Sequence, residues 1–161
     1  MTPDEIYVAL AQRVVGYLRA RGVPDPEDVA GEVFLQVARD LRRFRHAEDE
    51  IAVRRWVFTI ARNRAIDAAR RARRRPRSSG GEVPDQPEVP AEEPLDPVLV
   101  GALLQLTEDQ REVIALRFVA DLPLDDVARL TRRSLGATKA LQHRALENLR
   151  RSVSAEPPAA L

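Results

Sequence analysis

The sequence of 161 residues contains no cysteine, one tryptophan and only two histidines, His46 and His143. Without cysteine there can be no disulfide, no thiolate nucleophile and no cysteine-ligated zinc. The two histidines do not form a pair at metal-ligand spacing. No run approaches the roughly 18 apolar residues that a membrane helix needs. These absences predict a soluble, cytoplasmic protein with no membrane insertion, no metal and no cofactor.

Aromatic residues are scarce at 4%, but a hydrophobic content of 44% is enough for one compact domain or two small ones. The formal net charge of +1 hides a strong asymmetry along the chain. Residues 1–79 hold 17 arginines against 11 acids, whereas residues 80–97 hold six acids and no base. The basic first half indicates a partner that carries phosphates.

The stretch from residue 52 to residue 76 reads AVRRWVFTIARNRAIDAARRARRRP and combines an apolar helical stripe with dense arginine. Trp56 shares a helical phase with Val57 and Ile60, so one side of a helix should be buried. The surrounding cations are Arg54, Arg55, Arg62, Arg64, Arg70, Arg71, Arg73, Arg74, Arg75 and Arg77. Aromatic rings among arginines favour single-stranded nucleic acid, because bases stack on rings while cations hold the backbone. A solvated arginine face is the alternative.

Two amphipathic helices are expected before this stretch. Thr2 to Glu5 has the pattern of a capping box with proline at the first helical position, and a second start signal lies at Asp25. Acids in the first turn of that second helix are explained by the helix dipole rather than by a metal. A polar loop over residues 45–50 leads into the central helix, with Phe44 at its entrance.

Residues 77–95 alternate prolines with acids and predict a flexible, acidic linker. At roughly 3.1 Å per residue, the 21 residues from 77 to 97 reach about 65 Å, which is nearly two duplex turns. The linker divides the chain into domains at residues 1–76 and 96–153, followed by a tail at 154–161 that we expect to be disordered. The predicted fold class is all-α, with two small helical domains.

The second domain has start signals at Asp96 and Thr107, a short helix over residues 124–130, and a longer helix from Ser134 to about residue 151. The two last helices, separated by residues 131–133, fit a helix-turn-helix whose second helix enters the major groove. A plain helical hairpin is the alternative.

Both halves together resemble a sigma factor of bacterial RNA polymerase, of the small extracytoplasmic-function type. The resemblance to the region that binds the polymerase clamp lies in DPEDVAGEVFLQVARDLRRFR, and the resemblance to the region that melts and reads the −10 element lies in WVFTIARNRAIDAARRARR. Region 4, which reads the −35 element, is matched by LTEDQREVIALRFVADLPLDDVARLTRRSLGATKALQHRALENLRR. The partners this implies are the clamp and flap of core polymerase and promoter DNA; an anti-sigma partner is left open.

The resemblance implies three sets of residues and no catalytic residue. Core polymerase would bind Asp28, Glu32, Phe34, Leu35 and Arg39. The −10 element would be contacted by Phe44, Arg45, His46, Trp56, Ile60, Arg62, Asn63, Arg64, Arg70 and Arg71. The −35 element would be contacted by Arg132, Arg133, Ser134, Ala137, Lys139, Gln142, His143 and Arg144. Within the second set, Phe44, Ile60 and Asn63 match positions that shape a pocket for a flipped base.

Four positions depart from the family pattern. Pro123 replaces a serine or threonine and Arg132 replaces a glycine, so the start of the first helix-turn-helix helix and the turn should be less regular. Leu141 replaces an arginine and Thr138 a buried valine, which leaves the −35 sequence open. Two alternatives remain: a free-standing helix-turn-helix repressor and a metal-dependent hydrolase. The hydrolase would use acids such as Asp125, but Asp125 lies at a helix start, where capping explains it.

Overall fold

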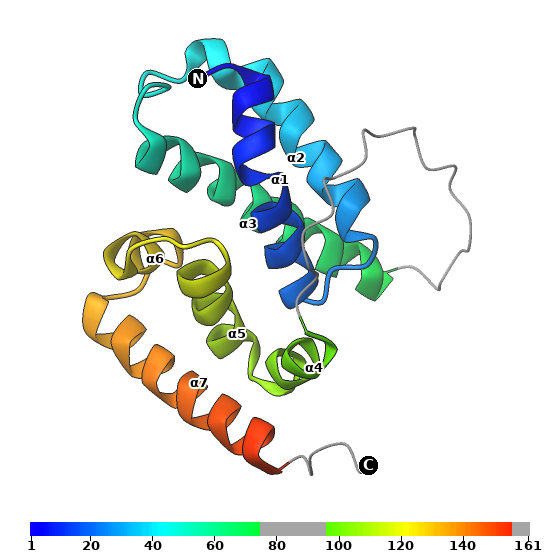
Figure 1. The fold of residues 1–161 in the computed structure, drawn as a ribbon, viewed down its shortest axis with the longest axis vertical. Helices are drawn as coiled ribbons and strands as arrows, with labels where there is room; N and C mark the ends of the chain where they lie inside the picture. Colours follow the sequence, from blue (N-terminus) through cyan, green and yellow to red (C-terminus); the bar gives the residue numbers. More distant parts are fainter. Residues whose placement is uncertain (75–95, 156–161) are drawn as a thin grey trace.

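A computed structural model describes residues 1–74 and 96–155, and this part of the chain consists of helices joined by short turns. The first helical unit contains α1 (Pro3–Ala20), α2 (Pro26–Asp40), the short 3-10 helix η1 (Leu41–Arg43) and α3 (Glu50–Arg74). The second contains α4 (Pro97–Gln105), α5 (Glu108–Ile114), the π-helical turn η2 (Ala115–Val119), α6 (Leu124–Leu130) and α7 (Leu135–Ala155). Figure 1 shows the first unit above the second. The predicted linker and most of the predicted tail lie outside the described residues, although α7 continues to Ala155, past the expected start of the tail.

The helix starts follow from local hydrogen bonding. The Thr2 hydroxyl accepts a bond from the Glu5 amide while the Glu5 carboxylate accepts one from the Thr2 amide, so the predicted capping box is confirmed. Gly22 then takes a φ of 74°, which ends α1. The start of α2 differs from the expectation: Asp25 has a φ of 52° and its side chain caps nothing. Pro26 at the first helical position remains as the local start signal.

The central helix α3 is anchored by Asp49, whose carboxylate accepts bonds from the amides of Ile51 and Ala52 at 3.1 and 3.3 Å. Its predicted apolar stripe is confirmed, because Val57 and Ile60 are buried against α1 and α2. Trp56 lies half-buried at the edge of that stripe.

In the second unit, Asp96 caps α4 and Thr107 caps α5, as predicted. The box at Thr107 is only half formed, since the Gln110 side chain accepts a bond from Asn148 on α7 instead of reaching back. Phe118 is apolar but 51% exposed. It lies within the π-helical turn η2, whose altered helical phase carries the ring to the surface.

The helix-turn-helix forms despite the departures noted in its sequence. Helix α6 covers Leu124–Leu130 as predicted, and Thr131 ends it by donating its hydroxyl to the Val127 carbonyl at 2.8 Å. Arg132 adopts a φ of 56°, so the turn keeps the left-handed conformation that glycine would take without strain. Ser134 then caps α7 through the Ala137 amide.

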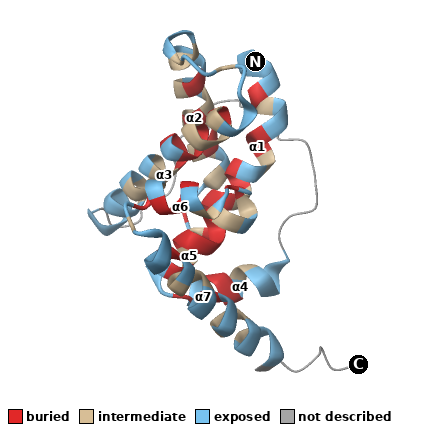
Figure 2. Cartoon of the chain, turned by 90° about the vertical axis from the view of Figure 1, so that its left-hand side faces the viewer, coloured by how far each residue is buried: buried red, intermediate tan, exposed pale blue. Residues whose placement is uncertain are grey.

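The two units pack on each other instead of standing apart. Buried side chains of both belong to one continuous hydrophobic cluster, and α1 contacts both η2 and α4. Figure 2 shows the buried positions where α1, α2 and α3 face one another and again across α5, whereas α7 is largely exposed. Across residues 1–74 and 96–155, no helix has the length and apolarity needed to cross a membrane.

Candidate nucleic-acid and polymerase interface

A stacked aromatic pair stands at the junction of the polar loop and α3. The rings of Phe44 and Trp56 lie 4.4 Å apart between centroids and are inclined by only 9°. His46 meets Phe44 edge-on at 6.1 Å, and its neighbour Arg45 is exposed. Aromatic faces next to free cations are what unstacked bases and their phosphates need, so this cluster can act as a stacking platform.

The structure separates the other two residues of the predicted base pocket. Ile60 is 6% exposed and belongs to the core, while Asn63 is exposed on the surface of α3. A spacing of three residues turns a helix by about 300°, so the two side chains lie on neighbouring sides of α3, with Ile60 toward the core and Asn63 toward solvent. That they shape one base pocket stays a prediction. Asn63 keeps a free amide that can pair with a base edge.

Arginines of α3 fall into two groups. Arg64 is held within the first unit, 3.4 Å from the Glu32 carboxylate and 3.1 Å from the Gln36 amide oxygen. Arg70 and Arg71, near the end of the helix, are exposed. Exposed arginines can hold phosphates at once, whereas paired ones must first give up a carboxylate.

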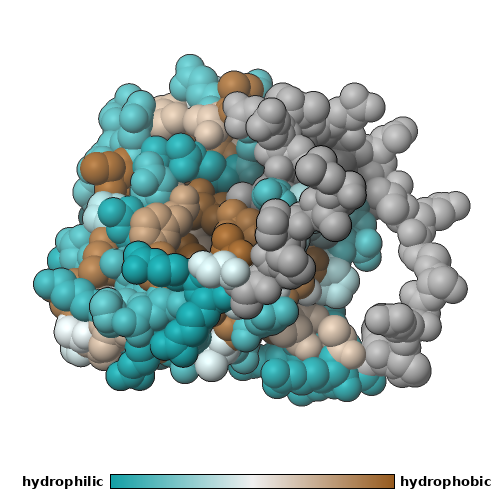
Figure 3. Space-filling model, turned by 60° about the horizontal axis from the view of Figure 1, so that its bottom comes forward, coloured by the Kyte–Doolittle hydropathy of each residue, from teal (hydrophilic) through white to brown (hydrophobic). Residues whose placement is uncertain are grey.

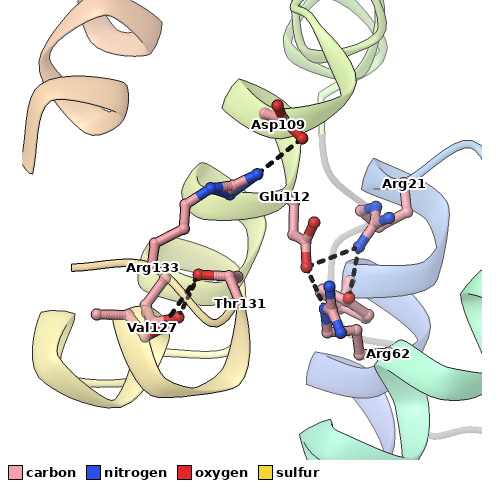
Figure 4. Close-up of polar contacts among 9 residues, drawn as sticks. Arg21, Arg62, Asp109, Glu112, Val127, Thr131 and Arg133 are labelled. Atoms are coloured by element: carbon pink, nitrogen blue, oxygen red, sulfur yellow. Dashed lines mark hydrogen bonds and ion pairs between the residues drawn. The ribbon is translucent and has the colours of Figure 1, made fainter. Parts of the chain in front are cut away.

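Arg62 pairs with an acid that lies far from it in the sequence. It bonds the carboxylate of Glu112 on α5, and Arg21 approaches the same oxygen at 3.9 Å (Figure 4). Glu112 is only 5% exposed, so its charge depends on these two cations. Arg21 also donates to the Tyr17 hydroxyl at 2.8 Å. Burial raises the pKa of Tyr17 to about 12, against a lowering by the Arg21 charge.

Three further ion pairs join the units, one of them between Arg13 and Asp121 at 4.0 Å. Arg55 lies 2.9 Å from the Asp126 carboxylate, which is 3% exposed, and Arg54 lies 3.6 Å from Asp121 and donates to its backbone carbonyl. Beside them, Arg111 closes the end of α4 by donating to three of its last carbonyls. Burial lowers the pKa of Arg111, and the nearby Arg21 charge adds to that effect. In each of these ion pairs, a basic side chain of the first unit meets an acid of the second.

The predicted polymerase-binding residues lie on α2. Leu35 is 56% exposed and Arg39 is exposed, so both are available to a protein partner. Asp28 is half-buried, and Phe34 supports the helix from behind by an edge-to-face contact with Tyr7 at 5.1 Å. An exposed leucine among charges is a plausible anchor for an interface.

The predicted −35 residues lie on α7 and in the turn before it. Ala137, Lys139 and Arg144 are exposed, and His143 is exposed but pairs with Glu147 along the helix at 3.2 Å. Arg133 is tied to Asp109 at 2.9 Å (Figure 4). Gln142 is half-buried, with its side-chain oxygen unpaired within the described residues. The exposed side of α7 therefore has the shape and charge of a recognition helix.

An apolar surface lies on α4 and α7, which pack together. Figure 3 shows apolar surface gathered on the bottom of the molecule, within a polar surround. The exposed apolar side chains of the two helices include Val98, Leu99, Leu104, Leu146 and Val153. Contiguous apolar surface of this kind is typical of protein interfaces.

Sequence reasoning missed Glu112, Asp126 and Arg21. One signal was present for the first: Glu112 precedes Leu116 by one helical turn, so it occupies a position on the buried side of α5. An acid at such a position requires a cation, but its partners lie too far away in sequence to be identified from the pattern.

Family models match both halves of the chain. The model for sigma-70 region 2 matches residues 6–75, and the model for sigma-70, region 4 matches residues 102–151. An extracytoplasmic-function (ECF) RNA polymerase sigma factor of Streptomyces coelicolor, BldN, is 33% identical over 142 residues, which cover 84% of this chain and 53% of BldN. The ECF sigma factor RpoE of Cereibacter sphaeroides is 31% identical over 156 residues, covering 93% of this chain and 85% of RpoE.

Solved structures agree with this fold. The sigma factor RpoE of Bartonella quintana, in complex with the anti-sigma factor NepR, gives a TM-score of 0.73 at 20% identity and covers 96% of this chain and 98% of that one. CnrH, in complex with the cytosolic domain of CnrY, gives 0.67 at 20% identity over 96% and 89%. The chain belongs to the sigma-70 family of RNA polymerase sigma factors, in the extracytoplasmic-function group. The first helical unit is region 2 and the second is region 4.

Proposed function

We propose that this sigma factor binds core polymerase through α2, reads the −10 element with α3 and the loop before it, and reads the −35 element with α7. The observation that carries the proposal is the presence, in one chain, of an exposed recognition helix and an arginine-rich helix beside a stacked aromatic pair. A duplex reader needs only the first of these features, whereas a factor that also holds melted DNA needs both. The protein has no reaction of its own in this scheme, since the polymerase supplies the chemistry.

The residues of region 2 divide the work between holding and reading. Arg70 and Arg71 would neutralise phosphates and supply affinity that falls with salt, without sequence information. Asn63 would read a base edge through its amide, and the Phe44–Trp56 stack would support the unstacked strand. Arg45, beside the stack, would add a further phosphate contact.

In region 4, Lys139 and Arg144 would enter the major groove from the exposed side of α7. Ser134 and the turn residues Arg132 and Arg133 would approach the backbone at the start of that helix. Because Leu141 is half-buried, its replacement of the family's arginine removes one cation from this surface without creating an exposed apolar side chain.

Two surfaces support protein partners. The exposed Leu35 and Arg39 on α2 fit the predicted contact with the polymerase clamp, and the apolar surface on α4 and α7 fits the flap as a second contact. One structural relative, RpoE of Bartonella quintana, is described in a complex with an anti-sigma factor, and an anti-sigma partner is therefore part of the proposal. With the polymerase as its main partner, the protein would act in the cytoplasm.

Run-off transcription with core polymerase on a pool of genomic promoter fragments tests this function. We expect a defined set of transcripts that requires both the protein and core polymerase. The Lys139→Ala/Arg144→Ala variant should lose promoters that have a −35 element while still binding core polymerase. Tight binding to duplex promoter DNA without any polymerase-dependent transcript would favour the free-standing repressor instead.

A further inference from the structure

A cavity of about 270 Å³ lies where the turn after α1, the second half of α3 and the start of α5 meet. Arg21, Arg73 and Arg111 line it together with apolar side chains and one acid, Glu108. None of its described lining residues is among those assigned above to polymerase or promoter DNA. We propose that this cavity binds a small organic anion, whose charged group the arginines hold while the apolar wall packs against the rest of the molecule. The inference goes beyond the proposed function and does not depend on it.

The side chain of Arg21 is nearly buried, yet part of its guanidinium has no partner. The side chain is 7% exposed, and both of its polar contacts use Nη1, which donates to the Tyr17 hydroxyl and approaches the Glu112 carboxylate (Figure 4). Nε and Nη2 have no hydrogen-bond partner among the described residues. Leaving buried donors of a charged group unpaired is costly, so an acceptor in the cavity would bind them favourably. A carboxylate suits this role, because its two oxygens match the fork of a guanidinium.

The positive charge around the cavity is only partly balanced. Arg111 donates from Nε and Nη2 to carbonyls at the end of α4, and these carbonyls carry no charge. No described carboxylate lies within ion-pair distance of Arg111 or of the exposed Arg73, while Arg21 shares Glu112 with Arg62. Burial lowers the pKa of Arg111, and the Arg21 charge adds to that effect. A bound anion would offset the repulsion between these two guanidinium groups.

The apolar wall of the cavity includes three small side chains of α3. Ala65, Ala69 and Ala72 are spaced by four and three residues, so their methyl groups lie along one side of the helix and leave room that a longer side chain would fill. The volume of about 270 Å³ equals that of about nine water molecules at roughly 30 Å³ each. The occupant therefore has on the order of ten non-hydrogen atoms and is smaller than a nucleotide. Carboxylic acids with an aromatic ring or a short aliphatic chain have this size.

Titration of the full chain with benzoate and with hexanoate tests the site. Benzamide, which has the shape of benzoate without its charge, is the control. We expect the better of the two anions to bind with a Kd on the order of 1 mM and to raise Tm with its concentration. Benzamide should bind about tenfold more weakly, because it offers the arginines no charged acceptor. No binding of either anion in the millimolar range, or equal binding of benzamide and benzoate, would overturn the proposal.

A variant that fills the cavity tests where the anion binds. Ala69 is exposed on α3, so Ala69→Leu places a larger side chain into the cavity without disturbing the core. We expect this variant to lose benzoate binding, whereas Ala69→Ser, which keeps the side chain small, should bind as the wild type does. In the wild type, benzoate should shift the NMR signals of the Ala65, Ala69 and Ala72 methyl groups. Undiminished binding by Ala69→Leu would place the anion elsewhere and reject the cavity as its site.

Two charge variants test the role of the arginines. Arg21→Lys keeps a cation near Glu112 but removes the fork, and it should weaken benzoate binding about tenfold, with Tm measured without benzoate as the check on folding. If this variant does not fold, Arg73→Gln decides the question, since it removes an exposed cation of the cavity rim and should weaken binding about threefold. Arg74→Gln, the neighbouring exposed cation that does not line the cavity, is the matched control. Equal benzoate affinities of Arg73→Gln and Arg74→Gln would contradict the proposal. These measurements use the protein without polymerase, so their outcome is separate from that of the transcription assay.

Discussion

Region 2 and region 4 differ in how the cations that we expect to contact DNA are paired. On α3, Arg62 pairs with a carboxylate of region 4 and Arg64 with one of region 2. On α7, Lys139 and Arg144 are exposed, and no described residue pairs with them. The cations in the middle of α3 are thus paired, whereas the two cations in the middle of α7 are free.

This difference indicates the order in which the cations of the two regions become available to phosphate. A free cation binds phosphate at the cost of counterions and solvent alone, whereas a paired one must also leave its carboxylate. Lys139 and Arg144 can bind phosphate as they stand, whereas Arg62 must first leave Glu112. The predictions below test this contrast, beginning with the largest expected effect.

Asp28→Lys/Glu32→Lys should weaken binding to core polymerase on the order of a hundredfold, because it reverses two charges beside the exposed Leu35. The same change removes the partner of Arg64, so thermal melting must confirm that the fold survives. Asp67→Lys, an exposed reversal on α3, is the matched control. Unchanged core affinity by titration would remove α2 from the polymerase interface.

The pH dependence of stability reports on the junction beneath Arg21. Burial raises the pKa of Tyr17 from 10.0 to about 12, so between these values only the unfolded chain ionises this residue. The free energy of unfolding should therefore fall as pH rises from 10 to 12, by roughly 2–3 kcal/mol from this group. Denaturant titrations at several pH values measure the slope. Tyr17→Phe should flatten it, and an identical slope would assign the loss to other groups.

Arg62→Ala should lower the free energy of unfolding by about 2 kcal/mol. The loss is smaller than for a fully buried pair, because Arg62 is partly exposed and Glu112 still has Arg21 as a partner. For a chain of this size that is a fall in Tm of roughly 4–8 °C. Arg70→Ala, which removes an exposed arginine of the same helix, should leave Tm unchanged. Equal melting of both variants would show that the contact between the regions contributes little.

Asn63→Ala should lower transcription from the preferred promoter about tenfold more than from a promoter altered at the matching −10 position, as expected when a base contact is lost. Arg70→Ala should instead weaken all promoters about equally, because a phosphate contact carries no sequence information. Transcription on a panel of single-base −10 variants distinguishes the two. A uniform loss with Asn63→Ala would make it a surface residue of α3.

The smallest effect is expected in region 4, where no rearrangement is needed. Lys139→Ala or Arg144→Ala should lower −35-dependent transcription about three- to fivefold, with a weaker salt dependence. Arg150→Ala, which removes an exposed cation of α7 outside the predicted −35 set, is the control. If the wild type transcribes a template with a scrambled −35 element equally well, α7 does not read bases.

Sequence patterns predicted the helices well where the signals act locally. The caps at Thr2, Asp96 and Ser134 each bond within three residues, so their effect could be identified from spacing alone. Phe118 shows the limit of this approach: this apolar residue reaches the surface because it lies within a π-helical turn. A change of helix type by one hydrogen bond leaves no clear trace in composition.

The positions of the candidate site residues were likewise predicted only in part. Exposed cations such as Lys139 and Arg70 lie where helical periodicity places them. Ile60 was assigned to a base pocket but is buried, because side-chain type alone does not separate a pocket wall from a core. The stacking of Phe44 on Trp56 was also undetermined, since it depends on how the loop returns to α3.

The sequence by itself determined the two helical units, their order, their family and the basic character of α3, because capping, periodicity and charge act over a few residues. The tertiary structure alone decided which arginines are free. Arg62 and Glu112 are 50 positions apart, and a pairing over that distance is set by how whole helices dock. Docking depends on the summed burial of many side chains and on one close approach at Gly16, and no local pattern contains that sum.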